Sequence, residues 1–112
     1  MPRLILLKTE QDFSQFRQSQ GYQTRLIRIR VRLGRNQNIP RFGFIIPKKV
    51  LPKAVHRNLL KRRMKAFLTR GLARIKPCDV LIFPKTELLK RNSEDLETEL
   101  VEVFSKAKLW KS

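Results

Sequence analysis

Apolar residues recur at helical spacing in the middle of the chain. Leu60, Met64 and Phe67 stand at positions i, i+4 and i+7, and Leu68 lies beside them in the sequence. This spacing predicts one helix over residues 54–70. One side of that helix can face a hydrophobic core, because residues at these positions share a face.

A second pattern precedes this helix. Within residues 25–33, three arginines (Arg28, Arg30 and Arg32) alternate strictly with apolar residues (Ile27, Ile29, Val31 and Leu33). The alternation predicts a half-buried strand whose apolar side faces a helix-covered core and whose arginines line the open face. Charges on an edge strand commonly prevent aggregation, but a row of three arginines with no acid between them is better explained by phosphate contact. The pattern leaves open whether residues 22–33 form one strand or two.

Two further strands are predicted. Residues 41–46 return as a strand after a polar connection over 35–38, which reads as a hairpin loop longer than two residues because it lacks an Asn-Gly pair. Residues 80–83 form a continuous apolar run bounded by Pro77 and Pro84. Such a run suits a buried central strand.

Helices are expected at both ends of the chain. One covers residues 10–20 and is ended by Gly21. The other begins at Asn92 or Ser93 and has an apolar stripe made of Leu96, Leu100, Val103, Phe104 and Ala107. The predicted order is α-β-β-(β)-α-β-α, an α+β two-layer sandwich with a small mixed sheet and helices on one side. We expect a single domain over residues 1–112.

The charge balance narrows the function. The chain has 112 residues, with 26 Lys and Arg against 9 Asp and Glu, so its formal net charge is +17. That excess predicts a polyanionic partner. No stretch approaches the ~18 apolar residues of a spanning helix, which favours nucleic acid over a membrane. The N-terminus shows no signal peptide pattern. Cys78 is the one cysteine, so no internal disulfide is expected and a reducing cytoplasm fits.

The cations of the predicted central helix gather on one face. On a helical wheel, an arc of about 140° holds Arg57, Asn58, Lys61, Arg62 and Lys65. We expect Lys61, Arg62 and Lys65 to project outward, opposite the apolar stripe. A solvated charged face usually mixes signs, yet the only acid between residues 51 and 85 is Asp79. Such cations repel one another unless a polyanion binds them.

These residues carry a family resemblance. The runs KKV at 48–50, AVHRN at 54–58 and LKRRMKAF at 60–67 together resemble the signature helix of the bacterial ribonuclease P protein subunit. The chain departs from that signature at Leu59 and Lys65, where the family usually has arginine. The pair Asp12-Phe13 resembles the start of the motif in the family's first helix.

The resemblance implies a function. The protein would be a cofactor of a catalytic RNA that removes 5′ leaders from precursor tRNA, with Mg²⁺ acting through the RNA and none bound by the protein alone. The fold would contain an unusual left-handed crossover through the basic helix. A cleft beside the first helix would hold the leader, with Phe13, Arg28 and Arg30 facing it. The RNA-binding residues would be Lys48, Lys49, Arg57, Asn58, Lys61, Arg62 and Lys65.

Other functions are weaker alternatives. An autonomous nuclease would need a positioned second group beside His56, the sole histidine, and no acid lies near it in the sequence. Neither a metal-ligand cluster nor a glycine-rich phosphate loop is present in the sequence, and no small-molecule substrate is expected. A small ribosomal or general RNA-binding protein would show the same charge. A cationic membrane-surface protein would need a spare apolar helix face.

Overall fold

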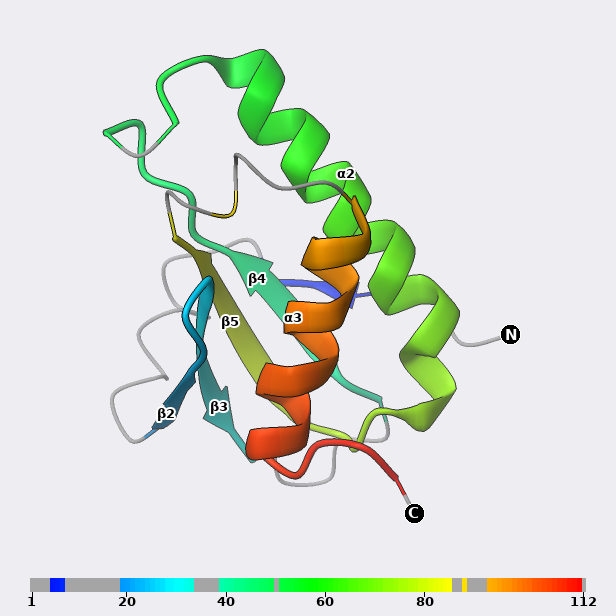
Figure 1. Ribbon diagram of the computed structural model, residues 1–112. Helices are drawn as coiled ribbons and strands as arrows, with labels where there is room; N and C mark the ends of the chain where they lie inside the picture. The colour runs from blue at the N-terminus through cyan, green and yellow to red at the C-terminus, as the bar shows by residue number, and fades with distance from the viewer. Residues whose placement is uncertain are drawn as a thin grey trace.

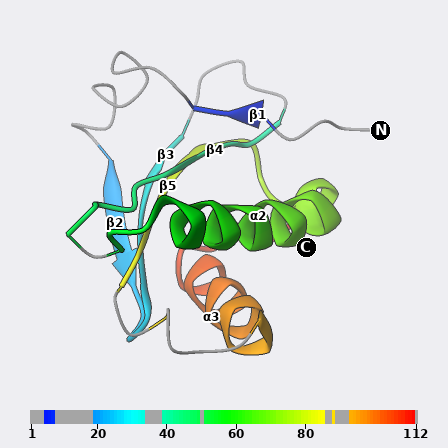
Figure 2. The same cartoon turned by 90° about the horizontal axis from the view of Figure 1, so that it is seen from above.

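The computed structural model describes residues 5–7, 19–33, 39–49, 51–85, 88 and 93–111. Within them, five strands form one mixed sheet, and the helices α2 and α3 lie together on one of its faces (Figure 1, Figure 2). In chain order the elements are β1 (Ile5–Leu6), β2 (Gln20–Gln23), β3 (Ile27–Arg32), β4 (Arg41–Phe44), α2 (Ala54–Gly71), the 3₁₀ helix η2 (Leu72–Arg74), β5 (Asp79–Pro84) and α3 (Ser93–Lys106).

The strand that comes last in the sequence lies at the centre of the sheet. The spatial order is β1-β4-β5-β3-β2, and β5 runs parallel to β4 and antiparallel to β3. Val80 and Ile82 of β5 are fully buried. The prediction of a buried central strand at residues 80–83 is therefore confirmed.

The predicted hairpin between β3 and β4 is wrong. These two strands do not pair, because β5 lies between them and bonds to both. Hydrogen bonds from the Arg41 amide to the Cys78 carbonyl (2.9 Å) and from the Ile45 amide to the Ile82 carbonyl (2.9 Å) extend the pairing of β4 with β5. The apolar run over 80–83 favours a central position in the sheet, where both faces are covered, and this outweighs proximity in sequence. Of the predicted loop, residues 35–38 lie outside the described residues.

The N-terminal part also differs from the prediction. Gln20 and Gly21 belong to β2 rather than to the end of a helix, and residues 10–18 of that expected helix lie outside the described residues. The stretch over 22–33 is two strands, and the Thr24 amide donates to the Ile27 carbonyl (2.8 Å) in the turn between them. Strand β1 was not predicted. It is only two residues long and adds to the edge of the sheet beside β4.

The chain crosses from β4 to β5 through α2 in an unusual sense. Seen from the helix side, both strands run in the same direction and β5 lies to the left of β4, with α2 in front (Figure 1). The crossover is therefore left-handed, whereas the general rule for parallel strands predicts a right-handed one. The family resemblance implied this handedness.

The core lies between the sheet and the two helices. Leu60, Met64 and Leu68 of α2 are buried, as the helical spacing predicts, and Phe67 is half-buried against the core. The apolar stripe of α3 is also confirmed. Phe104 in this stripe stacks on Phe42 of β4, with ring centroids 6.3 Å apart.

The residues after α3 pack against the C-terminal end of α2. Trp110 packs edge-on against Phe67 with 6.4 Å between ring centroids, and it forms an isolated bridge with Ile75. The Lys76 amide donates to the Leu109 carbonyl (2.8 Å). The position of α2 is thus set at this end by both packing and backbone hydrogen bonds.

Candidate nucleic-acid interface

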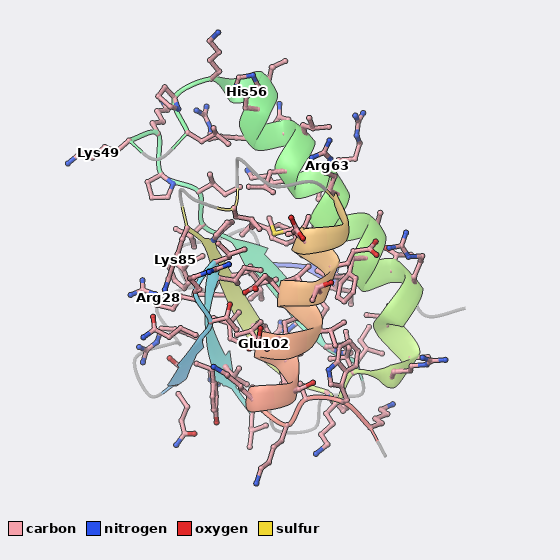
Figure 3. All side chains as sticks on the ribbon, viewed as in Figure 1. Arg28, Lys49, His56, Arg63, Lys85 and Glu102 are labelled. Carbon is pink, nitrogen blue, oxygen red and sulfur yellow. The ribbon has the colours of Figure 1, made fainter. Side chains whose placement is uncertain are left out.

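A cationic surface covers the turn before α2 and the N-terminal half of that helix. The first turns of α2 extend beyond the sheet, and Lys49 points away from the body of the protein (Figure 1, Figure 3). We call this region the helix surface. Its exposed polar side chains are Lys48, Lys49, Lys53, His56, Asn58, Arg62 and Arg63.

The helix surface belongs to a long segment without acids. The sequence contains no Asp or Glu between Asp12 and Asp79, whereas 18 of its 26 Lys and Arg lie in that interval. Such a one-sign field attracts polyanions and raises their local concentration. The helix surface is therefore part of a sequence segment that carries charge of one sign.

The predicted arc on α2 is correct, but it does not lie fully opposite the apolar stripe. Asn58 and Arg62 are exposed, while Arg57, Lys61 and Lys65 are half-buried. At about 100° per residue, these three lie beside the buried Leu60, Met64 and Leu68 instead of facing away. Their aliphatic stems can cover the border of the apolar stripe while the charged groups reach water.

Arg57 has a structural task that the sequence did not reveal. One of its terminal nitrogens donates to the Leu51 carbonyl (2.8 Å) and to the Pro52 carbonyl (2.7 Å). The Leu51 amide in turn donates to the Pro47 carbonyl (3.1 Å). Arg57 thus stabilises the turn before α2. Its other guanidinium nitrogens carry further N–H groups that can donate hydrogen bonds.

The opposite flank of α2 differs in charge. Arg70 forms an ion pair with Glu97 of α3, and α3 also carries Glu102 on its exposed side (Figure 3). The acids that the sequence concentrates in residues 94–102 therefore lie on the helix beside the C-terminal half of α2. This separation of sign leaves the N-terminal half as the strongly cationic part.

The sheet face opposite the helices forms a second candidate surface, which we call the outer face. Strand register places Arg28 beside Phe83, Arg30 beside Leu81, and Arg32 beside Asp79. Alternation directs these side chains away from the buried Ile27, Ile29 and Val31. The prediction that the arginines share the face opposite the core is confirmed. However, β3 is an interior strand and not an edge strand.

The outer-face arginines are engaged with neighbouring groups. The Arg28 guanidinium carbon lies 4.6 Å from the centre of the Phe83 ring, a cation–π arrangement. Arg30 donates to the Ser19 hydroxyl (2.6 Å) and to the Ser19 carbonyl (2.8 Å). Leu7 and Leu81 are buried on this face, with Phe83 packed against them. The outer face therefore combines fixed cations with an apolar floor.

One buried acid binds two arginines at one end of the outer face. Asp79 is 1% exposed and accepts two hydrogen bonds from Arg41, at 2.8 and 2.7 Å. Arg32 lies 3.4 Å from the same carboxylate. Sequence reasoning missed this cluster, although a lone acid within an otherwise basic segment was a usable signal.

The candidate catalytic side chains in the described part of the chain are Cys78 and His56. There, no group of three or more His, Cys, Asp or Glu could hold a metal ion. Burial, with a smaller effect from neighbouring Asp79, raises the pKa of Cys78 to about 12, so at neutral pH this thiol is not a nucleophile. His56 lies exposed on the first turn of α2 (Figure 3). Phe13, predicted to face the leader, lies outside the described residues.

Comparisons with known proteins identify relatives of this chain. A family model described as Ribonuclease P matches residues 1–108. The "Ribonuclease P protein component" of Synechocystis sp. is 33% identical over 109 residues, covering 96% of this chain and 88% of that protein. The protein of the same description from Pseudanabaena sp. is 25% identical over 111 residues, with 97% and 96% covered.

Solved structures share the fold. The Staphylococcus aureus RNase P protein superposes with a TM-score of 0.89 at 18% identity, covering 97% of this chain and all of that chain (100%). The Thermotoga maritima RNase P protein gives a TM-score of 0.81 at 21% identity, with 89% and 94% covered. In the described residues, no helix has the length and apolar character that crossing a membrane requires.

Proposed function

Because this chain belongs to the ribonuclease P protein family, we propose that it binds the catalytic RNA of that enzyme and the 5′ leader of precursor tRNA, and so supports removal of the leader. The family identity makes the chain a ribonuclease P protein component. The individual RNA contacts are our proposal, drawn from the two surfaces described above.

The observation that carries the proposal is the acid-free helix surface. Arg62 and Asn58 are exposed there, and Lys48 and Lys49 stand on the adjoining turn. Cations placed this way bind phosphates and release counterions, which supplies affinity independent of base sequence. Lys61, Lys65 and Arg57 complete the proposed contact with the catalytic RNA, with Arg57 also holding the turn.

The outer face is the proposed site of the leader. Arg28 lying over Phe83 presents a flat, cationic group to an unpaired base, and such bases stack on guanidinium planes and aromatic rings. Arg30, held by Ser19, would contact the backbone of the leader. Phe13 is the third proposed leader contact, on the strength of the motif resemblance alone.

Catalysis in this proposal belongs to the RNA. Mg²⁺ would be bound through the RNA, and the protein would lower the repulsion between two polyanions, so that substrate and metal bind more readily. We place this activity in the cytoplasm. The single buried thiol of Cys78 suits that reducing compartment.

Reconstitution tests the proposal. The protein is mixed with the catalytic RNA of its own source organism, and cleavage of a 5′-labelled precursor tRNA is measured as Mg²⁺ is lowered. We expect cleavage at Mg²⁺ concentrations at which the RNA alone is inactive. The protein alone should leave the precursor intact, because no acid lies near His56, its one histidine, in the sequence.

Two results would contradict this expectation. One is cleavage by RNA-free protein that disappears in His56→Ala, which would make the protein itself the nuclease. The other is unchanged Mg²⁺ dependence of the RNA combined with preferential binding to ribosomal RNA. That result would favour a small ribosomal or general RNA-binding protein.

Arg62→Ala should weaken binding to the catalytic RNA and lower the slope of log affinity against log salt by about one unit, because one phosphate contact is lost. The free energy of unfolding should change by no more than about 0.5 kcal/mol, as for an exposed site. Affinity is measured across a salt titration, and stability by a denaturant melt.

Arg74→Ala is the matched control for Arg62→Ala. It removes the same charge from an exposed position on η2, beyond the far end of α2. The control should leave the salt slope unchanged. Equal slopes for the two variants would show that the cations act only through net charge and that the helix surface is not the binding site.

A further inference from the structure

Two apolar side chains lie on the cationic part of α2 and away from the core. Val55 is 70% exposed, and Leu59, one turn further along the helix, is half-buried. Residues four apart are neighbours on one face of a helix. The two side chains therefore form a short apolar ridge, which we call the Val55–Leu59 ridge.

The ridge does not belong to the packed side of α2. At about 100° per residue, Val55 points about 180° away from Met64, the most buried residue of the stripe, and Leu59 points about 140° away. Leu60, next in the chain, is buried instead. The ridge thus contributes little to the core, and an isolated helix face gains nothing from exposed valine, a poor helix former.

The surroundings of the ridge are cationic. Arg62 and Arg63 follow Leu59 at positions i+3 and i+4, both are exposed, and His56 and Asn58 lie exposed on the same two turns. These turns extend beyond the sheet, so a large partner can reach them (Figure 1). The surface is hence an apolar strip bordered by phosphate-binding side chains, with no acid in the sequence from 13 to 78.

We propose that the Val55–Leu59 ridge packs against a base or ribose face of the catalytic RNA while Arg62 and Arg63 bind the flanking phosphates. This proposal rests on the proposed function, and it adds a contact of a different kind. Phosphate contacts position a protein on RNA, whereas contacts to bases and sugars distinguish one RNA from another. The ridge then contributes to the choice of RNA and not only to affinity.

RNA fits this surface better than a protein partner does. The charge around the ridge is of one sign, and a protein that covered it would have to supply several acids. RNA supplies phosphates together with apolar base and ribose surface that is free in loops and bulges. The apolar part of the contact releases no counterions, so its contribution is independent of salt.

Leu59→Ala and Val55→Ala test the inference. The source organism's RNA subunit and an unrelated structured RNA of equal length are titrated with each variant at several salt concentrations. We expect Leu59→Ala to bind the RNA subunit about five- to tenfold more weakly and Val55→Ala about threefold, in line with the apolar area removed. The salt slope should stay at the wild-type value, in contrast to that of Arg62→Ala.

The control variants distinguish loss of the apolar contact from loss of stability and from a change in side-chain shape. Leu59→Met keeps the apolar area and should retain wild-type affinity. Val101→Ala shortens another exposed apolar residue, 45% exposed on the acidic α3, and should leave binding unchanged. Thermal melts of all variants should coincide with the wild type, because the ridge lies outside the core.

The outcomes distinguish the inference from the proposed function. If the wild type binds the RNA subunit no better than the unrelated RNA, the proposed function fails and this inference with it. If the wild type prefers the RNA subunit but Leu59→Ala binds it within twofold of wild type, only the inference is overturned, and the ridge is left for a protein partner. A reduced salt slope for Leu59→Ala would also overturn it.

Discussion

Phe104→Ala is expected to lower the free energy of unfolding by about 3–5 kcal/mol, the usual cost of truncating a buried phenylalanine. Phe104 is fully buried, stacks on Phe42, and lies 5.6 Å from Trp110 between ring centroids. It therefore joins α3, the sheet and the C-terminal segment. Domains of this size are stable by only about 5–15 kcal/mol, so the variant should be close to unfolding.

A denaturant titration of Phe104→Ala beside Val101→Ala checks this expectation. Val101 lies on the same helix but is 45% exposed, so its variant should differ from the wild type by no more than about 0.5 kcal/mol. A loss below about 1 kcal/mol in Phe104→Ala would mean that α3 does not pack on the sheet as described.

Asp79→Asn is expected to destabilise the fold by about 3 kcal/mol. Removing one member of a buried ion pair costs about 3–5 kcal/mol, because the partner charge is left uncompensated. Arg32 and Arg41 are 33% and 35% exposed, so water can partly replace the lost carboxylate, and we expect the lower end of that range. The measurement is again the denaturant midpoint, at fixed pH and salt.

A double-mutant cycle shows whether the cost of Asp79→Asn comes from its arginine partner. Arg41→Gln is made alone and together with Asp79→Asn. Groups in direct contact couple by about 0.5–3 kcal/mol, so the double variant should be less destabilised than the sum of the two single variants. Strict additivity would show that the hydrogen bonds between Arg41 and Asp79 do not stabilise the fold in solution.

Local sequence patterns correctly predicted those elements whose buried residues can be identified from the pattern itself. The stripe of Leu60, Met64 and Leu68 marks the buried side of α2, because helical periodicity alone determines which residues share a face. The Pro-bounded apolar run predicted β5 for a similar reason. The apolar run over 80–83 must be covered on both faces, and that requirement is visible in the run itself.

Features that depend on distant parts of the chain were missed or misjudged. The hairpin between β3 and β4 was wrong because β5 enters between them from about 40 residues later, which no local pattern reports. Strand β1 is too short to show alternation. The pairing of Arg41 with Asp79 follows from the parallel register of β4 and β5, which is set only in the folded sheet.

The candidate site also has some features that local patterns predict and others that they do not. Helical spacing was enough to gather Asn58, Lys61, Arg62 and Lys65 on one arc of α2. The inward hydrogen bonds of Arg57 depend on the course of the preceding turn. Val55, in contrast, lies about 180° from Met64 on the helical wheel, so its exposed position could have been predicted from helical spacing.

The central position of β5, the last strand in the sequence, has a consequence for folding during synthesis. Domains dominated by pairings between distant residues fold slowly, because a long loop must close before those contacts form. During synthesis, β3 and β4 leave the ribosome before β5, the strand that bonds to both. Until then β3 has an open edge. Arg28, Arg30 and Arg32 give that edge three like charges, which keep two nascent chains from pairing strand to strand.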